Sequence, residues 1–288
     1  MRIVVITGCS TGIGLVAARH LARRGERVYA TARQPDRSPG LQEALAAEPN
    51  LRTLPLDVTD DKSVASAIET VLGREGRIDA LVNNAGIGTF GTFEFAPDSE
   101  LRATFETNFW GVIRVTRAVL PSMRARQSGV IVNISSIAGR LAGPAMGVYP
   151  ASKYALEAAS EALAREVYPL GIRVAIVEPG FVVTPILDKA LDTLELDADS
   201  PYADVERRIH MLFTNAKQVG SHPQAIAEVI EEAIVSNASK LRYPAGADAV
   251  ATMSGRARTS DEDWIALGRT MSDEEYFVEM GKIFTPQE

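Results

Sequence analysis

The sequence predicts an α/β protein with one parallel, seven-stranded, doubly wound sheet that helices cover on both faces. Short β-branched runs alternate with longer segments of helical periodicity, which is the order expected when crossover helices join parallel strands. Most of these runs are apolar throughout, as in strands that are buried on both faces. A glycine-rich turn follows the first run directly, at the end of a strand where such sheets bind ligands.

The seven strand candidates are short apolar segments, most of them bounded by turn residues. They span residues 2–7, 27–32, 51–58, 78–85, 129–136, 173–180 and, more weakly, 240–245. Apolar residues at helical spacing predict helices between them. These helices lie near residues 13–24, 61–74, 98–126, 150–168 and 223–236.

Two segments do not fit the regular alternation. Residues 181–222 are longer than an ordinary connection and follow the sixth strand, so we expect a substrate loop there. The tail 246–288 follows the last strand, and we expect it to pack over the sheet edge or against a partner subunit. Its aromatic residues include Trp264, Tyr276 and Phe277.

The composition is that of an ordinary globular protein. With 46% hydrophobic and 23% charged residues, the 288-residue chain is suited to one folded domain, residues 1–288, and disorder is not expected. The net charge is −7 and the basic residues are scattered, which argues against a nucleic-acid partner. No run of eighteen apolar residues or cleavable leader is present, so we predict a cytoplasmic protein without a membrane span.

Cysteine and histidine are too sparse in the sequence for an intramolecular disulfide or a typical metal site. The single cysteine, Cys9, cannot form an intramolecular disulfide and fits a reducing compartment. The three histidines, His20, His210 and His222, lack the spacing of metal ligands. We therefore predict no structural or catalytic metal.

The stretch "TGCSTGIG", which begins at Thr7, places Gly8, Gly12 and Gly14 at a strand-to-helix turn. Glycines allow the backbone to approach a pyrophosphate closely, and the following helix offers free N–H groups and a partial positive charge. A tight turn without a ligand is the alternative. The position in the first strand–helix unit favours nucleotide binding.

Further motifs follow in a fixed order. They are "LDV" with Asp57, "NNAG" at 83–86, "TNFWG" with Asn108, "NISS" with Ser135, "YPASK" at 149–153 and "PGFVVT" at 179–184. Over about residues 1–245 this set resembles the short-chain dehydrogenase/reductase family. Through "VYATAR", "TNFWGVIRVTRAVLP" and "LRYPAGADA" the chain is most similar to the branch of 17β-hydroxysteroid and retinol dehydrogenases. The resemblance implies a Rossmann-type fold and a nicotinamide cofactor.

The same resemblance assigns parts of the cofactor to individual residues. It implies that Asp57 binds the adenine amino group, that Asn84 to Gly86 line the adenosine ribose, and that Val182 and Thr184 hold the carboxamide. The complete set of expected cofactor contacts is Gly8, Ser10, Thr11, Gly12, Ile13, Gly14, Arg33, Asp57, Val58, Asn84, Ala85, Gly86, Tyr149, Lys153, Pro179, Gly180, Val182 and Thr184.

The end of the second strand predicts which nicotinamide cofactor binds. An acidic residue about 20 residues past the glycines would favour NAD, because it accepts hydrogen bonds from the ribose 2′-OH. Here Ala32 occupies that position and Arg33 follows, and an arginine would pair with a 2′-phosphate. We therefore expect NADP(H) to be preferred over NAD(H). A solvated surface charge is the alternative for Arg33.

Tyr149 and Lys153 are the central candidates for chemistry. Four residues apart on a helix, they share a face, whereas Tyr154 points elsewhere and is expected to pack. Proton transfer by a tyrosine near neutrality needs adjacent positive charge, since its pKa is ordinarily about 10. Ser135, at the end of the fifth strand, is expected to donate a hydrogen bond to the substrate carbonyl.

Two details qualify this set. Asn108 is a polar residue in an apolar helix, and it is either a core asparagine bonded to a carbonyl or, as the resemblance implies, the holder of a water linked to Lys153. The ordinary alternatives are a turn cap for Ser135 and helix-start packing for Tyr149. Pro150 is tolerated only in a first helical turn, so Tyr149 should lie at the helix start.

Apolar residues follow the "NNAG" motif, precede Tyr149 in "AGRLAGPAMGVY" and recur in the predicted substrate loop 181–222. Together they predict a lipophilic substrate, such as a steroid- or retinoid-like ketone or alcohol. The expected substrate contacts are Ser135, Leu141, Met146, Tyr149, Phe181, Ile186 and Met211. The alternatives are a ketoreductase of a specialised metabolite, polyketide or sugar-derived, and a non-catalytic NADP-binding regulator. The resemblance further implies a homo-oligomer, a dimer or a tetramer.

Overall fold

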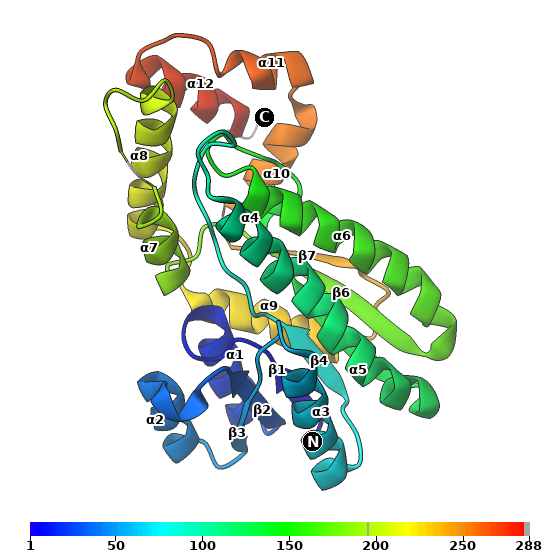
Figure 1. Cartoon of the computed structure of the whole chain (residues 1–288). Coiled ribbons are helices and arrows are strands. Elements are labelled where there is room, and N and C mark those ends of the chain that lie inside the picture. The colour runs from blue at the N-terminus through cyan, green and yellow to red at the C-terminus, as the bar shows by residue number, and fades with distance from the viewer. Residues whose placement is uncertain (195, 247, 285–288) are drawn as a thin grey trace.

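The computed structural model describes residues 1–194, 196–246 and 248–284. Its seven strands form one sheet in the order β3-β2-β1-β4-β5-β6-β7, and every neighbouring pair is parallel (Figure 1). The strands are β1 Ile3–Ile6, β2 Arg27–Ala32, β3 Leu51–Pro55, β4 Ala80–Asn83, β5 Gly129–Ile134, β6 Ile172–Pro179 and β7 Arg242–Ala245. The predicted doubly wound fold is confirmed, and the strand order reverses between β1 and β4, where such sheets bind ligands.

Helices cover both faces of the sheet. One face packs against α1 Gly12–Arg23, α2 Pro39–Ala47 and α9 Pro223–Val235, and the other against α3 Asp61–Glu75, α5 Gly111–Arg126 and α6 Val148–Val167. A hydrophobic core lies on each face of the sheet, and alternate residues of a strand point into one or the other. In β1, Val4 and Ile6 point towards α1, α2 and α9, whereas Ile3 and Val5 point towards α3, α5 and α6. All four are almost fully buried, which explains why these strands are continuously apolar.

The long helix predicted for residues 98–126 is interrupted. It consists of α4 Asp98–Phe105, a π turn Glu106–Trp110, and α5. Asn108 is central in the π turn and completely buried, and its side-chain amide bonds to the peptide of Ile87. Single π turns inside α-helices occur frequently at functional sites, and this one joins the helix to the loop after β4.

The segments outside the regular alternation form a helical cap above the carboxyl ends of the strands (Figure 1). It contains α7 Pro185–Leu191 and α8 Ala203–Val219 from the predicted substrate loop, and α10 Ala249–Arg258, α11 Asp261–Ala266 and α12 Asp273–Phe284 from the tail. We call these five helices the cap. Residues 195, 247 and 285–288 of the two predicted segments lie outside the described residues.

The tail does more than cover the sheet edge. α10 lies beside the edge strand β7, while α12 is tied to α8 by ion pairs. Arg207 and Arg208 both bind the Asp273 carboxylate at 2.8 Å. Arg208 is buried, and its guanidinium also lies over the Tyr276 ring. Two segments that are distant in sequence are therefore joined in one cap over the carboxyl ends of the strands.

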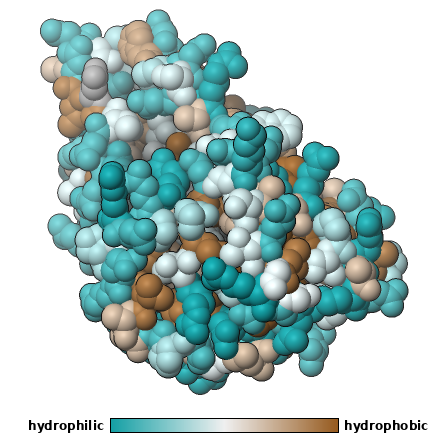
Figure 2. All heavy atoms as spheres, turned by 60° about the horizontal axis from the view of Figure 1, so that its bottom comes forward, coloured by the Kyte–Doolittle hydropathy of each residue, from teal (hydrophilic) through white to brown (hydrophobic). Residues whose placement is uncertain are grey.

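The face of the molecule that Figure 2 shows is mainly polar. In the view of Figure 2 hydrophilic side chains predominate and apolar ones are scattered among them. Among the described residues, no helix is both long enough and apolar enough to cross a bilayer.

Candidate active site

The glycine loop lies between β1 and α1, against the end of β4. Gly8 and Gly12 have φ angles of +72° and +61°, which favour glycine. A methyl group at Gly8 would lie 2.7 Å from Ala85 Cα, so this approach also requires glycine. α1 begins at Gly12, and its N-cap residue Thr11 makes no side-chain capping bond. The first N–H groups of α1 are therefore suited to an anion.

Thr7 and Asn84 hold the loop in place. The Thr7 hydroxyl oxygen accepts hydrogen bonds from the backbone nitrogens of Asn84 and Ala85, each at 3.0 Å. The Asn84 side chain donates to the carbonyl oxygens of Thr7 and Gly8 at 2.8 and 3.1 Å. Asn84 thus braces the loop, and its expected contact with the adenosine ribose stays a prediction. Gly14 is buried against Gly8 and does not line the cavity described below.

The end of β2 presents Arg33 on the surface. Among the described residues its guanidinium has no hydrogen bond or ion pair, and its side chain lines the cavity. Asp57, after β3, accepts bonds from the Thr59 nitrogen and hydroxyl at 2.9 and 2.7 Å. The loop, Arg33 and Asp57 line the same cavity, which fits the binding of an adenine nucleotide along the strand ends.

Tyr149 and Lys153 lie at the start of α6. The helix begins one residue before Tyr149, with Pro150 in its first turn, as the sequence predicts. The Lys153 ammonium is 5.8 Å from the centre of the Tyr149 ring and donates to the Ile134 carbonyl oxygen at 2.9 Å. Tyr154, the neighbouring tyrosine, is exposed and does not line the cavity.

Burial changes the acidity of both groups. It lowers the pKa of Lys153 to about 8, against the opposing effect of the Glu157 carboxylate. It raises the pKa of Tyr149, and a side-chain hydrogen bond with Ser136 opposes this rise. Lys153 therefore titrates close to neutrality, where a change in its charge changes the acidity of the tyrosine beside it.

Ser135, for which the donor role was predicted, and its neighbour Ser136 both line the cavity, but it is the Ser136 side chain that acts on Tyr149 and opposes the rise of its pKa. Ser136 begins the 3₁₀ turn Ile137–Gly139, and its hydroxyl accepts a bond from the Ala138 nitrogen at 3.1 Å. The Ser135 hydroxyl instead lies beside Gly139, where an added methyl group would be 2.8 Å from it. Adjacent residues at the end of a strand point in different directions, and the motif alone does not show which one faces the site.

Asn108 is engaged on both sides of its amide. It donates to the Ile87 carbonyl oxygen at 2.9 Å and accepts from the Ile87 nitrogen at 2.8 Å. It also donates to Ser152 Oγ at 3.2 Å, and that hydroxyl donates to the Tyr149 carbonyl oxygen. The observed contacts are those of a core asparagine that links the loop after β4 to α6. The predicted water link to Lys153 stays a prediction.

One cavity of about 1160 Å³ connects these groups. It extends from the glycine loop past Tyr149, Lys153 and Ser136 to a compartment under the cap. Its volume exceeds that of a usual single-ligand pocket and fits a dinucleotide together with a second molecule. The other predicted cofactor residues that line it are Ser10, Ile13, Val58, Ala85, Gly86, Pro179, Gly180, Val182 and Thr184.

Leu141, Met146, Phe181 and Ile186 line the compartment under the cap, where substrate contacts were predicted. Met211 was a wrong prediction: it is 43% exposed on the outer side of α8 and does not line the cavity. Other residues of α8 and of the tail, which the sequence analysis missed, face the cavity instead. They include Ile209, Leu212, Trp264, Tyr276, Phe277 and Met280. The helical spacing of α8 and the aromatic content of the tail were the available signals.

Two other kinds of chemistry find no support. Cys9 is fully buried, and burial raises the pKa of its thiol to about 12, so it is a poor nucleophile. Within the described part of the chain, no group of three or more histidine, cysteine or acidic side chains is arranged to hold a metal. The groups suited to chemistry are the tyrosine, the lysine and the serine beside the nucleotide loop.

Comparison with known proteins identifies the family. The family model described as short chain dehydrogenase matches residues 2–195. The chain belongs to the short-chain dehydrogenase/reductase family. It is 38% identical over 229 residues to a 3-ketodihydrosphingosine reductase of Bacteroides thetaiotaomicron, with 80% of this chain and 82% of the relative covered. It is 38% identical over 252 residues to human 17-beta-hydroxysteroid dehydrogenase type 1, covering 84% of this chain and 76% of the relative.

Solved structures of short-chain dehydrogenases share the fold. A short-chain dehydrogenase from Streptomyces avermitilis is 34% identical with a TM-score of 0.78, and 98% of each chain is covered. A metagenomic short-chain oxidoreductase in complex with NADP is 28% identical, with a TM-score of 0.67 and coverage of 84% of this chain and 95% of that one. The first of these matches along almost the whole chain, which includes the cap.

Proposed function

We propose that this short-chain dehydrogenase/reductase transfers hydride between NADP(H) and the carbonyl or secondary alcohol carbon of a lipophilic substrate. The observation that carries the proposal is the position of Tyr149, Lys153 and Ser136 in one cavity, between the nucleotide loop and an apolar compartment. The bound nicotinamide would supply or accept the hydride. The protein residues would supply orientation, a proton and stabilisation of charge.

The roles follow from the geometry. Ser136 and Tyr149 line the cavity together; the Ser136 hydroxyl would donate a hydrogen bond to the substrate oxygen, and Tyr149 would give that oxygen its proton during reduction. The Lys153 ammonium, 5.8 Å from the ring centre, lowers the free energy of the phenolate that remains. In the oxidising direction the same phenolate would remove the alcohol proton.

Arg33 supports NADP(H) over NAD(H). Among the described residues its guanidinium has no protein partner, and it lines the nucleotide end of the cavity. A guanidinium pairs well with a 2′-phosphate, whereas Ala32 offers no acceptor for a 2′-OH. Both cofactors are bound by structural neighbours, since one related structure carries NADP and another, a xylitol dehydrogenase, carries NAD⁺.

The compartment under the cap supports a lipophilic substrate. Its walls include aromatic and aliphatic side chains from α8, α11 and α12, and the cavity as a whole presents mainly apolar surface. The names of two relatives, 3-ketodihydrosphingosine reductase and 17-beta-hydroxysteroid dehydrogenase, indicate lipophilic substrates of different shapes. A ketone on a long aliphatic chain or on a fused ring system fits this description.

The test is a spectrophotometric screen of NADPH oxidation. It compares steroid, retinoid and 3-ketodihydrosphingosine carbonyls with polyketide and sugar-derived ketones. We expect turnover of lipophilic ketones; turnover of only the polar ketones would support the specialised-metabolite alternative. NADPH binding without any turnover would support a non-catalytic regulator.

A second test compares the two serines. Ser136→Ala should lower kcat far more than Ser135→Ala, and the reverse order would restore the role first predicted for Ser135.

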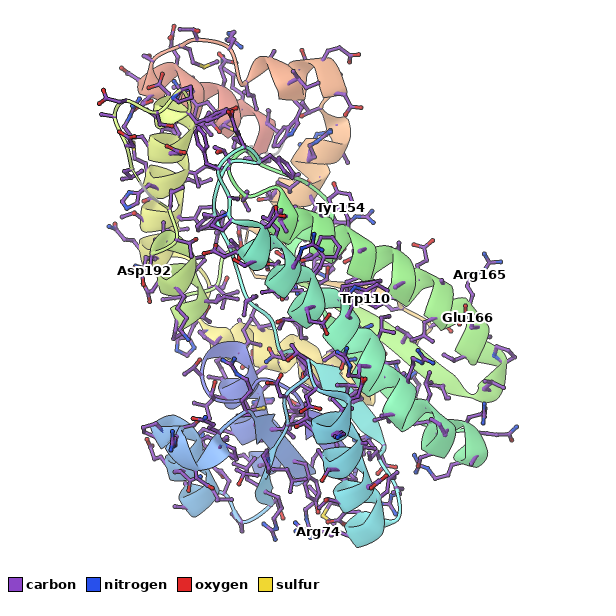
Figure 3. The ribbon with its side chains drawn as sticks, in the orientation of Figure 1. Arg74, Trp110, Tyr154, Arg165, Glu166 and Asp192 are labelled. Carbon is purple, nitrogen blue, oxygen red and sulfur yellow. The ribbon has the colours of Figure 1, made fainter. Side chains whose placement is uncertain are left out.

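We further propose a homodimer that forms through the outer side of α5 and α6. Trp110 is 52% exposed at the start of this side and Tyr154 is exposed on α6, and Figure 3 labels both along it. Exposed aromatic residues on two long neighbouring helices are typical of an interface. Light scattering should give twice the chain mass, and Trp110→Glu should give the monomer. A cytoplasmic location stays a prediction from the sequence.

A further inference from the structure

Two buried glutamates lie outside the cavity, close to Lys153. Glu157 is one turn further along α6, and Glu178 is near the end of β6; they are 4% and 1% exposed. Neither lines the cavity or has a part in the proposed hydride transfer. A buried carboxylate is costly unless it is paired and hydrogen-bonded, so two together require a physical explanation.

One arginine serves both carboxyl groups. The Arg242 Nε lies 3.0 Å from Glu157 Oε2 and 3.8 Å from Glu178 Oε1. The same guanidinium binds the exposed Glu161 carboxylate at 2.7 Å. Arg140 adds a weaker contact, with its Nε 4.0 Å from Glu178 Oε1. The nearest cation is therefore divided among three carboxyl groups, which leaves Glu178 with only distant compensation.

Among the buried side-chain oxygen atoms that have no hydrogen-bond partner in the described part of the chain, three belong to this pair and to the neighbouring Ser135. They are Glu157 Oε1, Glu178 Oε1 and Ser135 Oγ. Gly139 adjoins two of these side chains, because a methyl group there would lie 2.8 Å from Ser135 Oγ and 2.9 Å from Glu157 Cγ. Two carboxyl groups held around one cation in a buried place are the arrangement in which one of them keeps its proton.

The acidities agree with this geometry. Burial, with the Glu157 charge adding to it, raises the pKa of Glu178 to about 7, although Arg140 and Arg242 oppose the rise. The Glu157 carboxylate acts on Lys153 in the useful direction, since it raises a lysine pKa that burial lowers. The other charged groups that act on Glu178 are Arg140 after β5 and Arg242 of β7, and Arg242 also binds Glu161 of α6. Further out, Arg165 of α6 acts on Glu161, and Arg256 of α10 acts on Tyr154.

We infer that Glu157 and Glu178 form a proton-sharing pair in which Glu178 holds the proton near neutral pH and Glu157 is the anion that keeps Lys153 charged. Glu157 is then a positioning residue that acts on the reaction through Lys153. The inference rests on the proposed function for its kinetic consequence, whereas the shared proton itself is a property of the folded protein.

The kinetic test compares Glu157→Gln with Glu161→Gln. Both remove a carboxylate that binds Arg242, but only the first lies one helical turn from Lys153. Without the Glu157 charge, Lys153 should lose its proton at lower pH, so the alkaline limb of kcat for ketone reduction should move down by about one pH unit. Glu157→Asp should restore the limb, and Glu161→Gln should leave it in place.

A second test does not depend on turnover. Folding raises the pKa of Glu178 to about 7. The ionised group therefore lowers the free energy of unfolding progressively as the pH rises from the pKa of the unfolded chain towards about 7. Glutamine cannot ionise, so the melting temperature of Glu178→Gln minus that of the wild type should be larger at pH 8 than at pH 5. For Glu161→Gln, whose carboxylate Arg242 keeps at a lowered pKa, the difference should be the same at both pH values.

The outcomes separate the two proposals. Superimposable pH profiles for the wild type and Glu157→Gln, or an equal shift in Glu161→Gln, would overturn the role of Glu157. A melting difference for Glu178→Gln that does not grow with pH would overturn the shared proton. A wild-type protein without turnover would refute the proposed function instead, and the melting series would still decide whether the pair holds a proton.

Discussion

Replacing Gly14 by alanine should disturb the nucleotide loop without touching the catalytic residues. The added methyl group would lie 2.5 Å from the Gly8 carbonyl oxygen and still closer to the Asn84 side-chain nitrogen. Relief of such overlap costs about 1–3 kcal/mol, and each weakened bond from Asn84 to the loop costs about 1 kcal/mol more. We expect a destabilisation of about 2–4 kcal/mol and, since Gly8 must move, NADPH binding weaker by about tenfold or more.

The matched control is Gly73→Ala in α3. Gly73 is helical, and nothing lies within 4 Å of an added methyl group, so this variant should gain about 1 kcal/mol of stability. In thermal melts, the melting temperature of Gly14→Ala should fall and that of Gly73→Ala should rise relative to the wild type, by about 2–4 °C for each kcal/mol. Fluorescence titration with NADPH measures the second effect. A Gly14→Ala protein that melts and binds NADPH like the wild type would refute the close packing of the loop.

Three further changes test other parts of the account. Arg33→Asp should lower the ratio of kcat/KM with NADPH to that with NADH by about 100-fold, because an attraction becomes a repulsion; an unchanged ratio would remove Arg33 from the cofactor site. Met280→Trp should fill part of the compartment under the cap and raise KM for long or fused-ring ketones but not for short ones; equal effects would contradict the assignment. Asp273→Asn should accelerate hydrogen exchange in α12 and lower kcat/KM for bulky ketones, because it weakens the contact with Arg207 and Arg208. Asp204→Asn also removes a partner of Arg207, but within α8, and an equal effect would show that the ion pair between helices is not decisive.

The sheet could be predicted well because its signals are local. The run at residues 27–32 coincides with β2, and all seven predicted strands are present. Strands that are buried on both faces must be apolar throughout, and short connections mark their ends. The π turn at Glu106–Trp110 could not be predicted, since it depends on contacts between Asn108 and the peptide of Ile87, far away in sequence.

The site shows the same limit. Tyr149, Lys153 and the glycine loop are fixed by spacing within one element, and the structure brings them to one cavity. The choice between Ser135 and Ser136 depends on how the chain turns after β5. Met211 was wrong because tertiary packing of Ile209 and Phe213 against Phe90 decides which side of α8 faces inward. The cap could not be predicted either. Its position depends on ion pairs between residues more than sixty positions apart, such as Arg208 and Asp273.

The role of Tyr149 as proton donor is tested most directly by the rate of NADPH-dependent ketone reduction by Tyr149→Phe, measured beside Tyr154→Phe. Both variants lose one phenol hydroxyl within the same helix, but only Tyr149 lines the cavity near Lys153. We predict that Tyr149→Phe loses at least about 100-fold in kcat while binding NADPH with nearly unchanged affinity, and that Tyr154→Phe stays close to the wild type. Substantial turnover by Tyr149→Phe would contradict its role as the proton donor.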